Sequence, residues 1–456
     1  MPQTRLKLGQ TLGLSIDGCS HDGQGVGRWN DLVTFVPGAL PGERVTARLR
    51  RQAKRHLEAD LLSVDQASPD RERPACILAD RCGGCSLQHC SAAGQVRLKT
   101  DTVQQTLHRL AGIELQLPPL WPAAATLGYR NRALIPLERT AEGQLRAGYY
   151  RRGSHRIVNM NHCPVLDPRL DALIAPIKAD LEASGWPVDV NLSGDGGLRH
   201  LALRVGHHTG EVLITLVSSH GHLPGLEEQG ALWMARWPQV VGVGLNLQPR
   251  PTNVVLGPQT QLLAGRGWLL ERFADIELRI AADTFFQVNT QQAERLVPLL
   301  CSFFAVHTEP CIVDAYCGIG TFSLPLAAAG ARVVGLELHA TSVEQAIANA
   351  SRNQLGRAAF IQGDVAALLP GQLAQADGVV VDPPRKGLSD ATLSALISHG
   401  PRRMAYISCN PATLARDLAQ LCEPGPYRLL QVQPVDFFPQ TSHVECVALL
   451  EQRSGS

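Results

Sequence analysis

The spacing of hydrophobic and polar positions changes along the chain, and it first indicates a region of short strands. From about residue 4 to residue 64, apolar and polar residues alternate in short segments that glycine and proline interrupt, for example in the stretch 36–43. Alternation with a period of two predicts strands, and the frequent turn residues predict tight connections between them. We therefore expect a small antiparallel barrel at the start of the chain.

The next region combines one helix with a mainly β domain. Apolar residues in the segment 91–111 recur at the spacing of one helix face, and Gly112 supplies a stop signal. Farther along, the segments 201–205, 211–217 and 240–247 are apolar, contain β-branched residues and are separated by glycine-rich turns. The sequence therefore predicts a helix followed by a domain built mainly from strands.

After about residue 283, strand patterns alternate with helix patterns to the end of the chain. This order is typical of an α/β domain in which helices cover both faces of a parallel sheet. The seven expected strands are 311–315, 332–337, 359–362, 378–381, 403–408, 429–435 and 445–450. We expect a Rossmann-like, doubly wound fold that binds a nucleotide at the carboxyl ends of its strands.

The first three strand ends of this domain carry residues suited to a nucleotide. Gly318 and Gly320 allow a tight turn into the next helix and leave space for a ligand. Glu337 ends the second strand, 23 residues after Asp314, where a carboxylate can accept hydrogen bonds from both ribose hydroxyls of an adenosine group. Asp364 suits the adenine amino group. Because the third glycine of a dinucleotide fingerprint is missing, S-adenosylmethionine (SAM) is favoured over NAD.

Two further strand ends place an acid and a thiol at the same edge of the sheet. Asp382 precedes two prolines, whose backbone restriction would direct its side chain into the cleft, although a structural turn is the alternative. Cys409 follows the fifth strand at the transition into a helix. A thiolate that adds to C6 of a uracil turns C5 into a nucleophile for the methyl group of a sulfonium. Cys409 is therefore the candidate nucleophile.

This chemistry also needs a base that removes the C5 proton after methyl transfer. Glu445, at the start of the last strand, is the candidate, and His443 is the weaker one; a glutamate at a strand start is otherwise ordinary surface. A free thiol has a pKa of about 8.5, so a helix N-terminus or nearby cations must favour the thiolate of Cys409. Methylation of an amine in a protein or small molecule needs no thiol, which argues against that substrate class.

Composition and charge limit the remaining possibilities. The chain is 45% hydrophobic and long enough for two or three domains. It has no basic leader with an apolar core and no apolar run of about 18 residues, so we expect a cytoplasmic protein without membrane contact. The net charge of +1 argues against coating of nucleic acid by bulk electrostatics, although local patches can still bind phosphates.

Two such patches are present. The segment 121–170 holds eight arginines against three acidic residues, and the segment 48–55 holds five basic residues. Tyr129, Tyr149 and Tyr150 interleave with the first patch and can stack on unpaired bases. Either patch alone is equally consistent with solvated surface, so its meaning depends on the other signals.

Twelve cysteines are many for a reducing compartment, and four of them are candidate metal ligands. These four are Cys76, Cys82, Cys85 and the distant Cys163. Four thiolates can hold a tetrahedral zinc ion or an iron–sulfur cluster. The spacing does not distinguish these two sites from each other or from a set of unligated thiols. The compact three-cysteine motif of radical-SAM enzymes is absent from the sequence.

Five motifs in the last region resemble the RNA (uracil-C5)-methyltransferase family in order and spacing. They are Phe285–Asn289, Asp314–Gly320, Asp382–Arg385, Ser408–Thr413 and His443–Glu445. The resemblance implies that Cys409 is the nucleophile and Glu445 the base. It also implies SAM-contacting or pocket-shaping roles for Gln287, Tyr316, Thr321, Glu337, Asp364 and Asp382. The departures are small: Tyr316 stands where phenylalanine is frequent, and Thr321 where asparagine can occur.

The resemblance extends to nearly the whole chain. The first region, with motifs at 25–28 and 37–43, is similar to a TRAM domain, an OB-like RNA-binding barrel. The four cysteines are similar to the 4Fe-4S site of family members that act on bacterial large-subunit rRNA. The resemblance thus implies methylation of 23S rRNA at the uracil-1939 type of site, with SAM and a 4Fe-4S cluster as cofactors. A uracil in tRNA or elsewhere in rRNA is the alternative target, and a noncatalytic iron–sulfur ribosome-assembly factor is the alternative function.

The expected organisation follows from these regions. We expect a TRAM domain at 1–66, a central iron–sulfur and RNA-binding domain at 67–93 and 122–284, a helix at 94–121 that packs with the catalytic domain, and a SAM-dependent methyltransferase domain at 285–456. The target uracil must leave its stack, so we expect base flipping. The plausible first contacts with the RNA are Phe285, Tyr129, Arg130 and Arg132, although the two aromatic residues are equally consistent with domain-interface core. We expect a monomer that binds 23S rRNA and neither DNA nor membrane.

Overall fold

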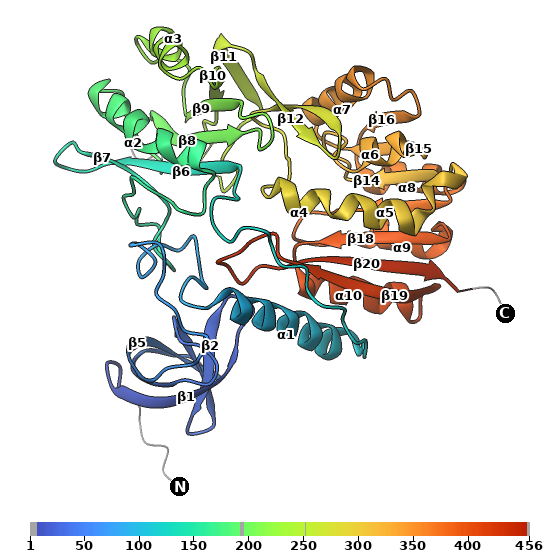
Figure 1. Ribbon diagram of the computed structural model, residues 1–456. Coiled ribbons are helices and arrows are strands. Elements are labelled where there is room, and N and C mark those ends of the chain that lie inside the picture. The colour runs from blue at the N-terminus through green and yellow to red at the C-terminus, as the bar shows by residue number, and fades with distance from the viewer. Residues whose placement is uncertain (1–6, 192–195, 251, 454–456) are drawn as a thin grey trace.

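The computed structural model describes residues 7–191, 196–250 and 252–453. The ends of the predicted first and last domains, residues 1–6 and 454–456, lie outside the described residues, as do residues 192–195 and 251 of the predicted central domain. A small barrel, a central β-rich domain and a larger α/β domain follow one another along the chain (Figure 1). The predicted fold class is confirmed.

Five strands form a closed barrel in the order β1-β2-β3-β5-β4. The strands are β1 (Thr11–Cys19), β2 (Gln24–Trp29), β3 (Leu32–Pro37), β4 (Arg44–Gln52) and β5 (His56–Gln66). Buried and exposed side chains alternate along β1, and Leu12, Leu14 and Ile16 enter the barrel core. Pairing of β1 with β4 closes the barrel, as the alternation in this region predicts. The barrel is not antiparallel throughout, however, because β3 and β5 pair in parallel.

One long helix, α1 (Ala92–Ala111), follows the barrel. Ser91 caps its start with a side-chain hydrogen bond, and Gly112 ends it in the left-handed region at φ 62°. The helix packs along α10 (Pro411–Cys422). Its residues Val103 and Leu107 belong to a core cluster of the α/β domain, so α1 joins the barrel to that domain.

The central domain is built on a six-stranded sheet in the order β11-β10-β9-β8-β6-β7. Its strands are β6 (Arg132–Arg139), β7 (Leu145–Ala147), β8 (Leu198–Val205), β9 (Val212–Ser218), β10 (Val240–Leu247) and β11 (Gln259–Gly265). Strands β9 and β10 are parallel, and the other neighbours are antiparallel. The helices α2 (Pro168–Ala183) and α3 (Leu226–Arg236) pack against this sheet.

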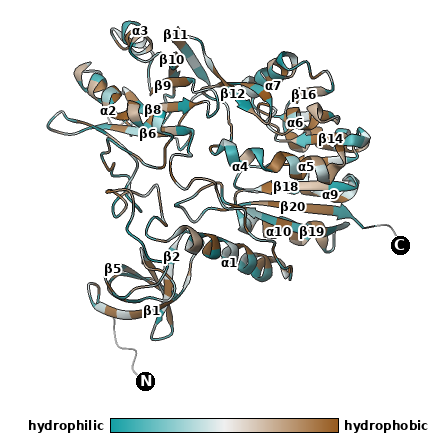
Figure 2. Ribbon diagram, viewed as in Figure 1, coloured by the Kyte–Doolittle hydropathy of each residue, from teal (hydrophilic) through white to brown (hydrophobic). Residues whose placement is uncertain are grey.

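The α/β domain contains a seven-stranded sheet in the order β16-β15-β14-β17-β18-β20-β19. Its strands are β14 (Cys311–Ala315), β15 (Arg332–Glu337), β16 (Ala358–Gln362), β17 (Gly378–Val381), β18 (Arg403–Ser408), β19 (Tyr427–Val435) and β20 (Glu445–Gln452). β20 runs antiparallel to both neighbours, which departs from the all-parallel sheet that we predicted. This reversal puts the start of β20 at the same edge as the end of β18. In Figure 2 these two neighbouring strands are largely hydrophobic.

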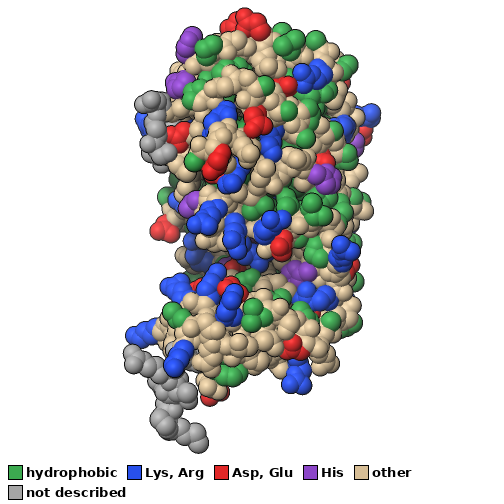
Figure 3. Space-filling view, turned by 90° about the vertical axis from the view of Figure 1, so that its left-hand side faces the viewer, with side chains coloured by type: hydrophobic (Ala, Val, Ile, Leu, Met, Phe, Trp, Pro, Cys, Tyr) green, Lys and Arg blue, Asp and Glu red, His purple; other side chains and the backbone are tan. Residues whose placement is uncertain are grey.

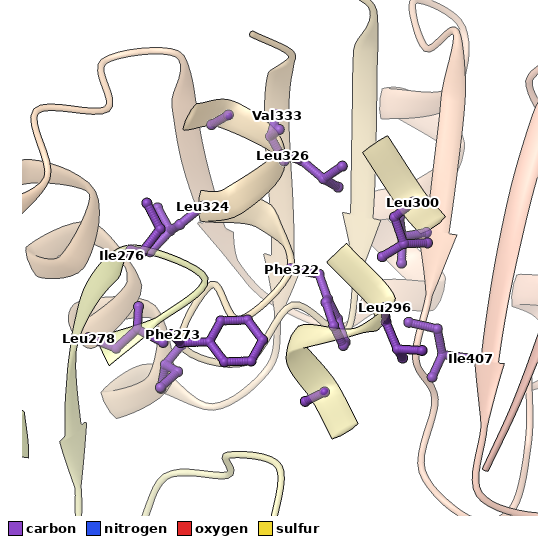
Figure 4. Close-up of a cluster of buried hydrophobic side chains, with 14 of the residues drawn as sticks. Phe273, Ile276, Leu278, Leu296, Leu300, Phe322, Leu324, Leu326, Val333 and Ile407 are labelled. Atoms are coloured by element: carbon purple, nitrogen blue, oxygen red, sulfur yellow. The ribbon is translucent and has the colours of Figure 1, made fainter. Parts of the chain in front are cut away.

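Short helices cover this sheet. They are α4 (Thr290–Glu294), α5 (Leu296–Phe304), the 3-10 turn η1 (Val306–Thr308), α6 (Ser323–Ala328), α7 (Ala340–Arg352), α8 (Val365–Leu373), α9 (Asp390–His399) and α10. A hairpin of β12 (Trp268–Phe273) and β13 (Ile276–Ala281) lies in the range that we assigned to the central domain. Its Phe273 and Leu278 nevertheless pack with Phe322 and Leu296 of the catalytic domain (Figure 4). The hairpin therefore belongs to the catalytic core by packing.

Candidate active site

The candidate nucleophile lies at the carboxyl edge of the catalytic sheet. Cys409 follows β18 and precedes Asn410, whose side-chain oxygen accepts a hydrogen bond from the backbone N–H of Ala412 at 3.1 Å and caps α10. The Ser408 hydroxyl accepts from the Asn410 N–H at 3.2 Å and fixes the bend between strand and helix. The thiol is half-buried. Its place beside the amino end of α10 favours an anion, because the helix dipole is positive there.

The charges around Cys409 determine how readily its thiol ionises. Burial, together with the carboxylates of Glu445 and Asp382, raises the pKa of Cys409 to about 11. The guanidinium of Arg385, which hydrogen-bonds the sulfur, acts in the opposite direction. The resting thiol is therefore protonated near neutral pH, and Arg385 is the cation placed to stabilise its thiolate.

The candidate base faces the same sulfur. Glu445 is the first residue of β20 and is 3% exposed. Ser408 pairs with Cys446 across the antiparallel strands β18 and β20. Cys409 follows Ser408, and Glu445 precedes Cys446, so both residues lie at the same edge of the sheet. Burial raises the pKa of Glu445 well above its usual range, and Asp382 adds to that rise. A carboxylate with a raised pKa is a stronger base once ionised.

His443, the weaker candidate base, has a different environment. Arg385 lies within 3.0 Å of its ring nitrogen Nε2. Burial lowers the pKa of His443 to about 4, and nearby Arg385 and Lys99 contribute to that fall. This makes His443 a poor proton acceptor, so the electrostatics favour Glu445.

Asp382 and Gln287, both predicted pocket residues, contact each other directly. Asp382 follows β17, and its Oδ2 accepts a hydrogen bond from Gln287 Nε2 at 3.3 Å. Burial raises the pKa of Asp382, and Asp314 adds to the effect. The backbone carbonyl of Gln287 accepts from Asn131 Nδ2 at 2.9 Å. The central domain is thus bonded to the segment that lines the active edge.

The predicted SAM loop follows β14 and has the geometry of a tight ligand-binding turn. Tyr316, Gly318 and Gly320 have φ angles of 69°, 56° and 85°. The left-handed region costs a tyrosine strain, which is typical of functional loops. Glu337 Oε2 accepts from the Gly318 N–H at 3.1 Å, so the carboxylate at the end of β15 adjoins this loop. The Tyr316 hydroxyl lies 3.4 Å from the Thr392 hydroxyl and points toward α9.

The other predicted residues of the SAM pocket lie around this loop. Thr321 is buried at its end. Asp364 is exposed after β16 and caps α8 by accepting from the Ala366 N–H at 2.9 Å. Asp314, at the end of β14, is buried, hydrogen-bonds Ser323, and has a pKa that burial raises to about 7. Carboxylates, glycines and a tight turn therefore meet at the carboxyl ends of β14, β15 and β16.

The proposed RNA contacts separate into buried and accessible residues. Tyr129 is 5% exposed, and its hydroxyl donates to the Pro439 carbonyl at 3.0 Å. It cannot stack on an RNA base: of the two interpretations that the sequence left open, the structure bears out the domain interface and not the RNA contact. Phe285 is 56% exposed beside Gln287 and remains available. Arg130 and Arg132 are half-buried.

The eight arginines of segment 121–170 are not equivalent. Arg139 donates to the carbonyls of Gly143 and Trp186, and Arg169 forms an ion pair with Asp167 at 2.7 Å, so both are used within the fold. Arg151, Arg152 and Arg156 are exposed. Figure 3 shows Lys and Arg side chains gathered at mid-height on one face of the molecule, beside a hollow above the barrel. Fewer arginines of this segment are therefore free to bind nucleic acid than the eight in the sequence suggest.

The four predicted cluster ligands lie near one another. The charges of Cys82 and Cys76 contribute to the raised pKa of Cys85, and those of Cys85 and Cys76 contribute to that of Cys163. Backbone N–H groups donate to two of the sulfurs, from Leu78 to Cys76 and from Gly84 to Cys82, both at 3.4 Å. Across residues 7–191, 196–250 and 252–453, however, no group of three or more His, Cys, Asp or Glu residues is placed to hold a metal ion. The 4Fe-4S assignment therefore stays a prediction.

Arg385 belongs to the predicted motif Asp382–Arg385, but the sequence alone indicated no role for its side chain. It is exposed, contacts the sulfur of Cys409 and the ring of His443, and so connects two strand ends of the active edge. The signal was available, because Arg385 follows the same strand as Asp382. Within the part of the chain that is described, no helix is long and apolar enough to cross a membrane.

Comparisons with known families agree with this layout. Residues 372–453 match the family model "tRNA (Uracil-5-)-methyltransferase", residues 5–62 match the TRAM domain, and residues 312–399 match a methyltransferase domain. The first match contains both Cys409 and Glu445, and the second covers the barrel except for the end of β5.

Whole-chain relatives extend the match. An RNA methyltransferase of Parasynechococcus marenigrum is 52% identical over 438 residues, which cover 95% of this chain and 94% of the relative. An RNA methyltransferase of Synechocystis is 45% identical over 98% of this chain and 97% of the relative. Among solved structures, the tRNA (uracil-54, C5)-methyltransferase of Pyrococcus abyssi in complex with S-adenosyl-L-homocysteine matches with a TM-score of 0.77 and 28% identity, over 96% of this chain and 99% of that one.

Proposed function

We propose that this chain, which belongs to the RNA (uracil-C5)-methyltransferase family, methylates C5 of a uracil in 23S rRNA with Cys409 as nucleophile and Glu445 as base. The convergence of Cys409, Glu445, Asp382 and Arg385 at one edge of the sheet carries this proposal. A thiol, a raised-pKa carboxyl and a guanidinium in contact are the groups that addition, deprotonation and elimination require.

The reaction proceeds in four steps at these residues. Cys409 loses its proton to solvent, and Arg385 and the amino end of α10 stabilise the thiolate. The sulfur then bonds to C6 of the uracil, which moves ring electrons toward C5 and the adjacent carbonyl. C5 bonds to the methyl group while the bond between that group and the sulfonium breaks. Glu445 takes the C5 proton, the C5–C6 double bond reforms, and the sulfur of Cys409 leaves C6 with its electron pair.

SAM supplies the methyl group and the sulfonium leaving group. Glu337 is placed to accept hydrogen bonds from the ribose hydroxyls, because its Oε2 already adjoins the Gly318 turn at 3.1 Å from that N–H. Asp364 keeps an exposed carboxylate beside this position for the adenine amino group. Gln287 and Asp382 shape the pocket between SAM and Cys409, since they hydrogen-bond to each other at 3.3 Å.

The choice of 23S rRNA, at the uracil-1939 type of site, is the finer part of the proposal. The barrel together with the four-cysteine group supports it, because this combination resembles the members of the family that act on large-subunit rRNA. The tRNA alternative draws on the Pyrococcus abyssi structure, which matches 96% of this chain and carries tRNA uracil-54 in its name. The two alternatives place 5-methyluridine in different RNAs, so an experiment can distinguish them.

We test the substrate by incubating the protein with labelled SAM and either a 23S rRNA fragment that spans the uracil-1939 region or unmodified tRNA. Mapping of 5-methyluridine should place the label at one uracil of the 23S fragment, and Cys409→Ala should abolish it. Label confined to tRNA would overturn the rRNA assignment. Absence of label from both RNAs would overturn the reaction.

We also propose that Cys76, Cys82, Cys85 and Cys163 hold a 4Fe-4S cluster with a structural role. Their proximity and their all-sulfur character support it, as do the N–H groups directed at Cys76 and Cys82. The Gly83 N–H donates to the Tyr150 carbonyl at 2.8 Å, so a cluster would stabilise the contact between this loop and the basic segment. The methyl transfer itself needs no electron transfer.

Metal analysis of anaerobically purified protein tests this part. We expect about four iron atoms and as many sulfides per chain, lost in Cys163→Ser. Cys90→Ser is the matched control and should keep the iron, because Cys90 packs with Leu40 and Leu87 in a separate apolar cluster. Stoichiometric zinc, or no metal, in the wild-type protein would overturn the cluster.

A further inference from the structure

Two arginines of the central domain lie side by side behind the active edge. Arg132 of β6 and Arg204 of β8 are direct partners in the antiparallel pairing of these strands. Arg204 is 5% exposed, and its Nη2 donates to the Thr284 carbonyl at 2.6 Å. Its buried Nε atom has no hydrogen-bond partner in the structure. One guanidinium donor is therefore left unsatisfied in the interior.

The charge of this pair is only partly compensated. The Asp283 carboxylate acts on both guanidinium groups, and Arg130 adds a further positive charge beside Arg132. Burial lowers the pKa of Arg132 to about 10 and lowers that of Arg204. Arginine nevertheless stays protonated near neutral pH. The interior thus keeps an excess positive charge, which is unfavourable unless an anion joins it.

A large cavity opens onto Arg132 and Asp283. It has a volume of about 1080 Å³ and lies between the central sheet and the catalytic domain, where His339 also lines it. His339 is two residues beyond Glu337, the carboxylate at the SAM loop, and its N–H donates to Glu337 Oε1 at 2.8 Å. The cavity is therefore large enough for a nucleotide and adjoins the expected adenosine site.

The same wall of the cavity is bonded to the catalytic residues. Asn131, the neighbour of Arg132, donates to the Gln287 carbonyl at 2.9 Å, and Gln287 donates to Asp382 at 3.3 Å. Val254 on the cavity rim is 64% exposed and offers an apolar surface. An anion bound at Arg132 would thus lie a short distance from the pocket of the target base.

We propose that Arg132, assisted by the charge of Arg204, binds the phosphodiester of the nucleotide next to the target uracil. This inference rests on the proposed function, because it assigns the bound anion to the RNA substrate. A guanidinium fork matches phosphate oxygens in two parallel hydrogen bonds. A phosphate held here fixes the strand on one side of a base that has left its stack. The carboxylate of SAM shares the oxyanion chemistry and is the competing occupant.

The test measures RNA affinity against salt concentration in wild-type protein and in Arg132→Gln. The probe is the 23S rRNA fragment that spans the uracil-1939 region, observed by filter binding without SAM, and SAM affinity is measured separately by calorimetry without RNA. We expect the Kd for RNA to rise on the order of tenfold. The slope of log affinity against log salt should fall by about one, and the Kd for SAM should stay unchanged.

Two further variants make the result specific. Arg132→Lys keeps the charge but loses the fork, so it should keep the salt slope while losing affinity, and it guards against misfolding of the glutamine variant. Arg402→Gln is the control, because Arg402 precedes β18 at the end opposite Cys409 and pairs with Glu451 at 3.1 Å. Arg402→Gln should leave both quantities unchanged.

Two outcomes would overturn the assignment. An unchanged RNA affinity and salt slope in Arg132→Gln would show that no phosphate binds there. A loss of SAM affinity with RNA affinity retained would assign the cavity to the SAM carboxylate instead. A failure of the wild-type protein to methylate RNA would overturn the proposed function. The salt dependence of RNA affinity is measured without SAM, so it tests the phosphate contact of Arg132 independently of that failure.

Discussion

A buried ion pair connects α1 to the loop that leads into the catalytic base. Lys99 Nζ lies 2.5 Å from Asp436 Oδ1, and the two side chains are 1% and 6% exposed. Lys99 also donates to the Phe438 carbonyl at 3.0 Å. The segment from Asp436 continues through His443 to Glu445, so this pair fixes one end of the active edge.

Asp436→Asn removes one charge of the pair and leaves the other buried. Breaking a buried pair in this way costs about 3–5 kcal/mol of unfolding free energy. For a domain of this size, the cost corresponds to a fall of roughly 6–20 °C in the melting temperature measured by calorimetry. Glu451→Gln is the matched control, because it breaks the more exposed pairs with Arg402 and Arg428 and should cost less than about 1 kcal/mol.

The pH dependence of the variant gives an independent test. Burial lowers the pKa of Lys99, and Asp436 opposes this fall. Without the carboxylate, the folded pKa lies farther below the unfolded value of about 10.4, so the unfolded state binds more protons between the two values. The stability of Asp436→Asn should therefore rise toward that of the wild type as the pH rises to about 10. A cost equal to that of Glu451→Gln, or a deficit that grows with pH, would refute the reasoning.

Three predictions concern the reaction itself. Glu445→Gln should slow release of 5-methyluridine by about 10²–10⁴-fold and accumulate a protein–RNA complex in a denaturing gel; release at the wild-type rate would contradict its role. The single-turnover rate should rise with pH from about 6 to 9 because the pKa of Cys409 is raised to about 11. Arg385→Gln removes a group that lowers this pKa, so it should move the rise in rate to higher pH. An unchanged pH profile would show that Arg385 does not act on the thiol. Glu337→Gln should raise the Kd for SAM about tenfold in calorimetry, and the exposed Glu344→Gln should not; equal effects would exclude the ribose contact.

The order of elements in the catalytic domain was predictable because its strands are short apolar runs bounded by glycine, proline or polar residues. Strands 311–315, 332–337, 378–381 and 403–408 have the predicted ends. The direction of β20 was not predictable. A strand buried on both faces is apolar throughout, and such a run contains no signal for its orientation. The structure supplies that direction, and with it the meeting of Glu445 and Cys409.

The candidate RNA surface was less predictable, because residue type does not identify a partner distant in sequence. Tyr129 reads as an aromatic within a basic segment, but its hydroxyl bonds to Pro439, 310 positions away. Arg169 reads as a free cation, but it pairs with Asp167. Arg204, by contrast, lay outside the segment that we singled out and reads as part of a strand. Its burial and its pairing with Arg132, which only the structure shows, are the observations that identify Arg204 as part of a candidate anion site.

The central claim is that Cys409 forms a covalent bond to C6 of the target uracil. RNA that carries 5-fluorouridine tests it directly, because fluorine replaces the proton that Glu445 removes and so blocks the final elimination. After incubation with SAM, we expect a stable complex whose peptide map places one methylated 5-fluorouridine on Cys409. No complex, or attachment to another thiol such as Cys317 beside the SAM loop, would contradict the account.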